Sequence, residues 1–380
     1  MASAGVKTYL YHLSKELLAI AGKDNIRLFP FLRSLGTLDH GRSSEGRIAT
    51  LTRLVYMHHA NRIGPLNRWF APKTDLFHCT NQILNPPRHG RLTSTVHDMT
   101  CWLLPETHRP ATIERDKLFA NLVLRRSDRL VAVSESSRRD AIEILGIDPD
   151  RVDVIYSGVT INYFAAASAR TDAVRLSYGL DKPYVIFVGT IEPRKNVDAL
   201  IDAFVASGDA IRKEFDLVIV GPYGWKSEST AARLESGIPS VRYLGYVPEN
   251  DLPLLTSAAE VLAYPSLYEG FGFPVAQAMA AGTAVLTSNV SSLPEIAGEA
   301  ALLVEPRYLD SIRDGLIHLL HSPSLREELA RKGCERAQLF TWRRVAEETW
   351  RFFEKACEMP AGTIEPNGTG SGAQAAGSSS

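Results

Sequence analysis

The feature that most constrains this chain is an alternation of short apolar runs with helical patterns, which occurs twice. In the first half, runs typical of buried strands occupy residues 75–79, 92–97, 129–133 and 152–156. In the second half, they occupy residues 184–189, 216–221, 241–244, 261–264, 283–287 and 300–304. Strands that alternate with helices at this spacing are typical of a mostly parallel, doubly wound sheet. Two such series predict two Rossmann-like α/β domains that face a cleft, where ligands tend to bind.

Changes in pattern mark the boundaries of these domains. Residues 1–165 and 183–341 hold the two series, whereas residues 166–182 have no strong pattern and are predicted to be a linker. Residues 342–358 have the periodicity of a final amphipathic helix. Residues 361–380 are rich in Gly, Ser and Ala, a composition typical of a disordered tail.

The start of the chain is unusual for such a domain. Helical periodicity over residues 8–21 begins after only seven residues, Met1 to Lys7. An α/β domain normally begins with a strand before its first helix. The first strand of the N-terminal domain is therefore expected to be missing.

The bulk composition is that of an ordinary globular protein. A length of 380 residues suits two or three domains, and 45% of the residues are hydrophobic and 22% charged. No apolar run approaches the ~18 residues that cross a bilayer, and the N-terminus has no signal-peptide pattern. Four widely separated cysteines form no CxxC pair, which predicts reduced thiols in a cytoplasmic protein: Cys79, Cys101, Cys334 and Cys357.

The overall charge of −1 conceals a basic N-terminal region. Residues 1–96 contain 13 basic and 5 acidic side chains. This excess favours an anionic partner, such as lipid headgroups at a membrane surface or a phosphate-bearing acceptor, although a merely solvated basic face is an equal alternative. Nucleic acid is disfavoured because neither a reading helix nor an aromatic-plus-basic repeat accompanies the charge.

A strand, a glycine turn and a helix follow one another between Tyr264 and Gly282. Gly270 and Gly272 lie on either side of Phe271, just before a helix built from small residues. The free amides of such a helix N-terminus can bind a phosphate or another anion. Glu269, at the mouth of the turn, suggests a ligand with hydroxyl groups or a role in chemistry. An ordinary βα loop with a solvated glutamate is the alternative.

Two further segments carry candidate ligand contacts. Arg194 and Lys195 stand after the strand that ends at Gly189 and just before a helix, an arrangement suited to a diphosphate. A solvated charge pair is the alternative. His97 falls at the C-terminal end of its strand, where open α/β sheets place ligand contacts. The alternative for His97 is a core histidine that caps the strand.

Together these segments resemble the group 1 (family 4) retaining glycosyltransferases with the GT-B fold, and in particular mannosyltransferase-like members. The resemblance covers roughly residues 4–358. It rests on Gly189-Thr-Ile-Glu-Pro-Arg-Lys-Asn196, Leu244-Gly-Tyr-Val247, Tyr264-Pro-Ser-Leu-Tyr-Glu-Gly-Phe-Gly-Phe-Pro274, Ser291-Ser-Leu-Pro-Glu295, Thr95-Val-His-Asp98 and Val133-Ser-Glu-Ser136.

This resemblance implies a donor-binding C-terminal domain and an acceptor-binding N-terminal domain, with the last helix crossing back onto the N-terminal one. It implies transfer of a hexose, most simply mannose from GDP-mannose, with retention of anomeric configuration and without a metal ion or another cofactor. The acceptor would be a glycan or a lipid-linked glycan in polysaccharide or lipopolysaccharide assembly. The enzyme would then work in the cytoplasm, peripherally at the inner face of the membrane.

The resemblance also implies roles for the matched residues. Arg194 and Lys195 would neutralise the donor diphosphate, whose departure develops negative charge. Glu269 would bind the hydroxyls of the donor sugar and support positive charge at its anomeric carbon. His97 would reach the sugar from across the cleft. The backbone of Gly270, Phe271 and Gly272 would contact the phosphate or the sugar. Val247 would lie against the base.

Three departures from the family pattern, one of them the missing first strand, motivate the alternative of a catalytically weak protein. Gln277 stands where relatives carry a second glutamate, and its carbonyl can still accept a hydrogen bond from a ribose hydroxyl. Thr190 stands where many relatives carry an arginine. The alternatives are a transferase that uses a UDP- or dTDP-sugar, a catalytically weak nucleotide-sugar-binding protein, and a sugar-nucleotide epimerase of the same architecture.

The segment Asp148-Pro-Asp150 has the DxD form of metal-dependent glycosyltransferases of the other fold. Here it joins a predicted helix to a predicted strand, and Asp-Pro is ordinary turn chemistry. No metal site is predicted from it.

Overall fold

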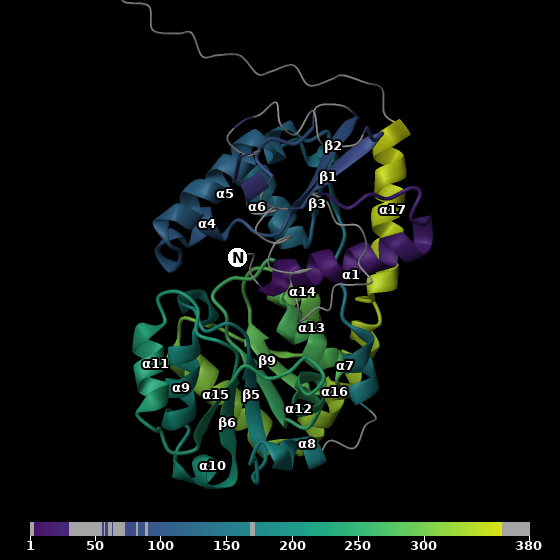
Figure 1. Cartoon of the computed structure of the whole chain (residues 1–380). Coiled ribbons are helices and arrows are strands. Elements are labelled where there is room, and N and C mark those ends of the chain that lie inside the picture. Colours follow the sequence, from purple (N-terminus) through teal and green to yellow (C-terminus); the bar gives the residue numbers. More distant parts are fainter. Residues whose placement is uncertain are drawn as a thin grey trace, which may run out of the picture.

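The computed structural model describes residues 4–29, 55–56, 58–59, 63, 73–80, 83–87, 90–167 and 172–358. It contains two parallel sheets, one in each half of the chain, and each sheet belongs to its own α/β domain (Figure 1). The predicted α/β class with two doubly wound domains is therefore confirmed. The predicted tail at 361–380 lies outside the described residues.

The N-terminal sheet has four parallel strands in the order β1-β2-β3-β4. They are β1 (Leu76–Cys79), β2 (Arg91–Val96), β3 (Arg129–Ala132) and β4 (Val152–Val154). Its connections contain α4 (Thr100–Leu103), η2 (Pro105–Thr107), α5 (Pro110–Leu122), η3 (Leu124–Arg126), α6 (Glu135–Leu145) and η4 (Pro149–Arg151). Each strand agrees with its sequence-based prediction to within two residues at either end.

Local side-chain chemistry explains the ends of α6. The Ser134 hydroxyl accepts a hydrogen bond from the Ser137 amide at 3.0 Å and so caps the first turn. Gly146 ends the helix with φ of 61°, a left-handed conformation that favours glycine. Beyond it, the Asp148 carboxylate accepts from the Asp150 amide at 3.0 Å. The Asp-Pro-Asp segment is thus the turn that opens η4, as its sequence indicates.

The C-terminal sheet has six parallel strands in the order β10-β9-β8-β5-β6-β7. They are β5 (Tyr184–Val188), β6 (Asp216–Val220), β7 (Val241–Gly245), β8 (Val261–Tyr264), β9 (Ala284–Ser288) and β10 (Leu302–Val304). Residues of β5, β6, β8 and β9 are buried throughout, because helices cover both faces of the sheet. The strand order reverses between β5 and β8, which makes their C-terminal ends the topological switch point.

Helices surround this second sheet. They are η5 (Pro193–Lys195), α9 (Val197–Ala206), α10 (Asp209–Glu214), α11 (Glu228–Glu235), α12 (Leu252–Ser257), α13 (Phe273–Ala280), α14 (Leu293–Ala297), α15 (Leu309–His321) and α16 (Pro323–Ala337). The segment predicted to be a linker without pattern is partly helical. It contains α8 (Asp172–Ser177), whereas α7 (Ile161–Ala166) reaches only its first residue, and both helices pack against α12.

The first and last helices connect the two domains. The chain leaves the C-terminal domain where Thr341 bridges Val159, and α17 (Trp342–Glu358) then packs on α1 (Ala4–Ala21) and on β1 and β2 (Figure 1). The predicted return of the last helix to the N-terminal domain is confirmed. Tyr9 of α1 belongs to the same buried apolar cluster as the C-terminal sheet, so one core runs through this junction. None of the helices that the structure describes has the length and apolar character to span a bilayer.

Candidate active site

The candidate site lies at the switch point, where the loops after β5 and β8 meet. Asn196, with φ of 60°, turns the chain from η5 into α9. Its side-chain amide donates to the carbonyls of Pro265 (3.1 Å) and Pro306 (2.7 Å). These bonds hold the loop that carries Arg194 and Lys195 against the segments that follow β8 and β10.

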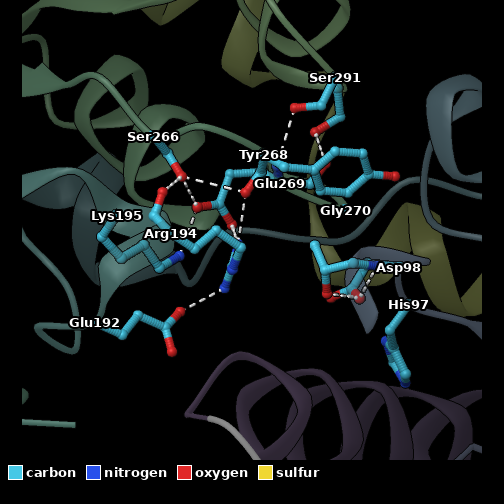
Figure 2. A network of polar contacts seen from close by, with 12 residues as sticks. His97, Asp98, Glu192, Arg194, Lys195, Ser266, Tyr268, Glu269, Gly270 and Ser291 are labelled. Carbon is cyan, nitrogen blue, oxygen red and sulfur yellow. Dashed lines mark hydrogen bonds and ion pairs between the residues drawn. The ribbon is translucent and has the colours of Figure 1, made fainter. Parts of the chain in front are cut away.

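A buried carboxylate lies between the two cations. Oε1 of Glu269 is 2.5 Å from Nζ of Lys195 and accepts hydrogen bonds from Ser266 (2.7 Å) and Tyr264 (2.9 Å). Oε2 forms an ion pair with Arg194 at 2.9 Å. Figure 2 shows these side chains converging from both loops. Because Glu269 is only 7% exposed, its interactions are little screened by water.

These contacts fix the ionisation state of Glu269. Burial on its own would raise the pKa of Glu269, but Arg194 and then Lys195 outweigh it and lower the pKa from 4.5 to about 2. Burial, helped by the charge of Arg194, lowers the pKa of Lys195. Glu269 is therefore a carboxylate at neutral pH. It is suited to accept hydrogen bonds and to stabilise positive charge, and unsuited to act as a proton donor.

Arg194 also contacts a second acid and the backbone. Its guanidinium donates to Oε1 of Glu192 at 2.7 Å and to the carbonyl of Tyr268 at 2.6 Å. The other carboxylate oxygen of Glu192 is buried and has no hydrogen-bond partner among the described residues. Two cations and two carboxylates thus form one buried network with balanced charge (Figure 2).

The glycine turn after Glu269 approaches the N-terminal domain closely. A Cβ atom on Gly270 would lie 1.9 Å from the carbonyl oxygen of His97, so only glycine fits there. Gly272, with φ of 95°, immediately precedes α13. Among the described residues, no group accepts a hydrogen bond from the Phe271 or Gly272 amide. Both amides lie at the start of α13 and are free to donate to a ligand, as in a helix N-terminus that binds an anion.

The His97 ring does not point toward Glu269. In Figure 2 it extends toward α1 and away from the carboxylate. Its Nε2 lies 3.1 Å from the carbonyl oxygen of Thr80, and the Tyr9 ring packs edge-on at 5.0 Å. Burial lowers the pKa of His97 to about 4, so the imidazole is neutral at pH 7. This position matches the alternative of a packed histidine at a strand end, and the catalytic role of His97 stays a prediction.

Neither of the two predicted nucleotide-binding residues takes part in the ion pairs of the charge network. Val247 follows β7, is 4% exposed and belongs to the apolar core. Gln277 is half-buried on α13, and its side-chain amide makes no hydrogen bond to a described residue. The structure therefore brings together Arg194, Lys195 and Glu269, and leaves the roles of Val247 and Gln277 as predictions.

Several polar residues around Glu269 escaped sequence reasoning. Two of them, Tyr264 and Ser266, belong to the same family motif as Glu269, but nothing in its spacing indicates that both hydroxyls face the same carboxylate oxygen. Glu192 precedes Arg194 by two residues, and such a spacing could have suggested a neutralising partner. Within the described ranges, no three His, Cys, Asp or Glu side chains are grouped where they could hold a metal ion.

Two parallel-sheet α/β domains, with a buried cation–carboxylate network at the switch point of the second, form the architecture of the GT-B fold. The family model for glycosyl transferases group 1 matches residues 171–336, and that for glycosyltransferase family 4 matches residues 3–163. The O-antigen chain mannosyltransferase B of Escherichia coli is 31% identical over 360 residues, which cover 91% of this chain and 94% of that protein. The chain belongs to the group 1, family 4 glycosyltransferases, and it is an enzyme of the transferase class.

Other relatives match less of their own length or show the fold alone. The serotype-specific mannosyltransferase WbdA of Escherichia coli is 29% identical over 253 residues, 63% of this chain but 31% of that protein. WaaG, a glycosyltransferase involved in lipopolysaccharide biosynthesis, superimposes with a TM-score of 0.67 at 15% identity over 93% of this chain and 96% of that one. Anabaena HepE in complex with UDP-glucose gives 0.66 at 19% identity over 92% and 96%.

Proposed function

We propose that this enzyme is a retaining hexosyltransferase that moves mannose from GDP-mannose to a glycan or a lipid-linked acceptor in polysaccharide or lipopolysaccharide assembly. The observation that carries the proposal is the Glu269 carboxylate, buried between Arg194 and Lys195 at the switch point. The names of the relatives support the sugar, since both O-antigen chain mannosyltransferase B and WbdA are called mannosyltransferases.

In this proposal the two cations would assist the departure of the nucleotide. When the bond between the sugar and the diphosphate breaks, negative charge grows on the leaving phosphate oxygen. Arg194 and Lys195 would stabilise that charge, together with the Phe271 and Gly272 amides at the start of α13. Cations that are held in place before the reaction spend no energy on reorganisation during it.

Glu269 would act on the sugar. As an ionised carboxylate it can accept hydrogen bonds from sugar hydroxyls and stabilise the positive charge that develops at the anomeric carbon. Among the described residues, Arg194 also pairs with Glu192, whereas the ion pair of Lys195 is with Glu269. A donor diphosphate that forms ion pairs with both cations would weaken their ion pairs with Glu269. The carboxylate could then accept hydrogen bonds from the sugar.

The remaining roles are proposals of the same kind. His97 would have to leave Thr80 and Tyr9 to reach the donor sugar, and Val247 and Gln277 would contact the nucleoside. Because Arg194 and Lys195 supply positive charge at the diphosphate, transfer is expected without a metal ion. The basic N-terminal region would place the enzyme on an anionic membrane surface that carries the acceptor.

A donor panel tests the proposal. The enzyme is incubated with GDP-mannose, UDP-glucose or a dTDP-sugar and a lipid-linked glycan acceptor, and release of nucleoside diphosphate is followed with and without chelator. GDP release that requires the acceptor and persists in chelator is expected. Turnover of UDP-glucose but not GDP-mannose would overturn the donor assignment and keep the class. One observation favours this alternative: HepE has the same fold, and its structure was solved with UDP-glucose.

A calorimetric titration separates the enzyme from a binding protein. A catalytically weak nucleotide-sugar-binding protein would bind the donor without turnover, and the Glu269→Gln variant would behave like the wild type. The proposed transferase instead turns over its donor, and the same substitution lowers the rate.

A further inference from the structure

One face of α6 contacts the loop that carries Glu269. Ser134, Ser137 and Asp140 recur at intervals of three residues, which places them on the same side of the helix. We call residues 265–272 the donor loop, because they follow β8 at the switch point. The three α6 side chains belong to the N-terminal domain and the donor loop to the C-terminal domain, so their contacts cross between domains.

These contacts involve the residues immediately before and after Glu269. On one side, the Tyr268 hydroxyl donates a hydrogen bond to the carboxylate of Asp140. On the other side, the carbonyl of Gly270 accepts hydrogen bonds from Ser134 (2.6 Å) and Ser137 (3.2 Å). The N-terminal domain therefore contacts the Tyr268 side chain on one side of Glu269 and the Gly270 backbone on the other.

The Tyr268–Asp140 bond is strong for its kind. Tyr268 is 7% exposed, and burial, with Asp140 next in importance, raises the pKa of its hydroxyl, which therefore remains a donor. Burial raises the pKa of Asp140, and the hydrogen bond from Tyr268 opposes this by favouring the carboxylate. A hydrogen bond to an ionised carboxylate is roughly twice as strong as one between neutral groups. The carbonyl of Tyr268 also accepts from Arg194, so the same residue links α6 to the cations of the site.

A second contact fixes the N-terminus of α6 itself. Glu295, at the end of a family motif on α14, accepts hydrogen bonds from the amides of Glu135 (2.7 Å) and Ser136 (3.2 Å). A carboxylate at these free amides is favourable because the helix dipole is positive there. The register between α6 and the C-terminal domain is thus set by contacts at both the donor loop and α14.

We propose that Asp140, Ser134 and Ser137 are positioning residues, which orient Glu269 through Tyr268 and Gly270 when the two domains are in contact. This inference rests on the proposed role of Glu269. Binding of the nucleotide to the C-terminal domain does not require α6, whereas turnover does. Loss of the α6 contacts should therefore lower kcat and leave nucleotide affinity unchanged.

A double-mutant cycle tests the inference in the intact enzyme. Tyr268→Phe and Asp140→Ala each remove one partner of the bond, and each should lower kcat about tenfold, because small misplacements of a catalytic group are costly. The double variant should lose no more than either single variant, since both remove the same interaction. The KM for the donor and the calorimetric Kd for GDP should stay at the wild-type values.

Two matched variants separate positioning from a loss of folding. Asp140→Asn keeps a carbonyl acceptor for Tyr268 and should restore most of the rate lost in Asp140→Ala. Tyr178→Phe removes a similar Tyr–Asp hydrogen bond, to Asp251 at 2.7 Å, that does not touch the donor loop, and it should turn over like the wild type. Unfolding midpoints of all variants report whether the fold is intact.

Failure of the inference differs from failure of the proposed function. Rate losses that multiply in the double variant, or a raised KM with unchanged kcat, would overturn the positioning role in an enzyme that still needs Glu269. A Glu269→Ala variant with wild-type turnover would instead overturn the proposed function, and the inference with it.

Discussion

At the scale of single residues, two neighbouring cations share one buried carboxylate. Arg194 and Lys195 occupy different oxygens of Glu269, and two hydroxyls complete the shell of Oε1. Removing any one charge leaves the others buried without a full set of partners, which is costly in a weakly polar interior. In the proposed mechanism, stability and catalysis therefore depend on the same three side chains.

Truncation of this network should abolish most of the activity. Glu269→Ala and Lys195→Ala are each expected to lower kcat by at least ~10²-fold, the scale of a lost preorganised electrostatic contact. Lys182→Ala is the matched control. Lys182 pairs with Asp216 at the N-terminal ends of β5 and β6, whereas the candidate site lies at the C-terminal ends of β5 and β8. Steady-state release of nucleoside diphosphate measures all three. Wild-type rates for both Glu269→Ala and Lys195→Ala would refute the site.

The depressed pKa of Glu269 has a consequence for stability. Because the folded-state pKa of about 2 lies below the ordinary 4.5, ionised Glu269 stabilises the fold above pH 4.5. This contribution is lost as the pH falls from 4.5 towards 2. The free energy of unfolding in urea should therefore be greater for the wild type than for Glu269→Gln at pH 6, and the difference should shrink below pH 4.5. A difference that is independent of pH would contradict the ion pairs.

At the scale of elements, the strands were predictable and the contacts between domains were not. Strands covered on both faces appear as continuous apolar runs, so β5, β6, β8 and β9 stand out in the sequence. Helix α17 begins and ends where its periodicity predicts, at Trp342–Glu358. The short α8 has too few turns to show a periodicity, so the sequence predicts a linker where this helix lies.

The same limit applies to the site. Arg194, Lys195 and Glu269 were predictable as neighbours because two loops at a switch point must meet. The direction of the His97 ring was not, because it depends on packing against Tyr9 of α1. The spacing of Ser134 and Ser137 indicates a helix cap, but their second bond, to the donor loop, exists only once the domains are in contact.

The close approach of Gly270 to the carbonyl of His97 gives a prediction for the contact between the two domains. In Gly270→Ala the new methyl group would meet the carbonyl oxygen of His97, and overpacking of this kind costs about 1–3 kcal/mol. Separation of the domains would relieve the clash. The variant should show an increased radius of gyration in small-angle scattering and a reduced kcat. An unchanged radius together with wild-type turnover would contradict the close approach.

At the scale of the whole molecule, the charge is unevenly divided along the chain. The basic excess lies in residues 1–96, only part of which the structure describes. Attraction to an anionic surface falls off within a Debye length, about 10 Å at 0.1 M salt. A membrane-bound acceptor would therefore be reached through a contact that salt can weaken.

Vesicle sedimentation tests this contact. Vesicles that contain anionic lipid should retain the enzyme at low ionic strength and release it at high ionic strength, whereas neutral vesicles should retain little at either. Equal retention by anionic vesicles at low and high salt would count against a basic membrane-facing surface.

The most direct test of the central claim is the anomeric configuration of the product. Mannose is α-linked in GDP-mannose, and a retaining transferase with Glu269 at its donor site keeps that configuration. Nuclear magnetic resonance of the glycan formed from GDP-mannose should therefore show a new α-mannosyl residue, formed in step with the GDP released. A β-mannosyl product, or no mannosyl product in the presence of a competent acceptor, would contradict the claim.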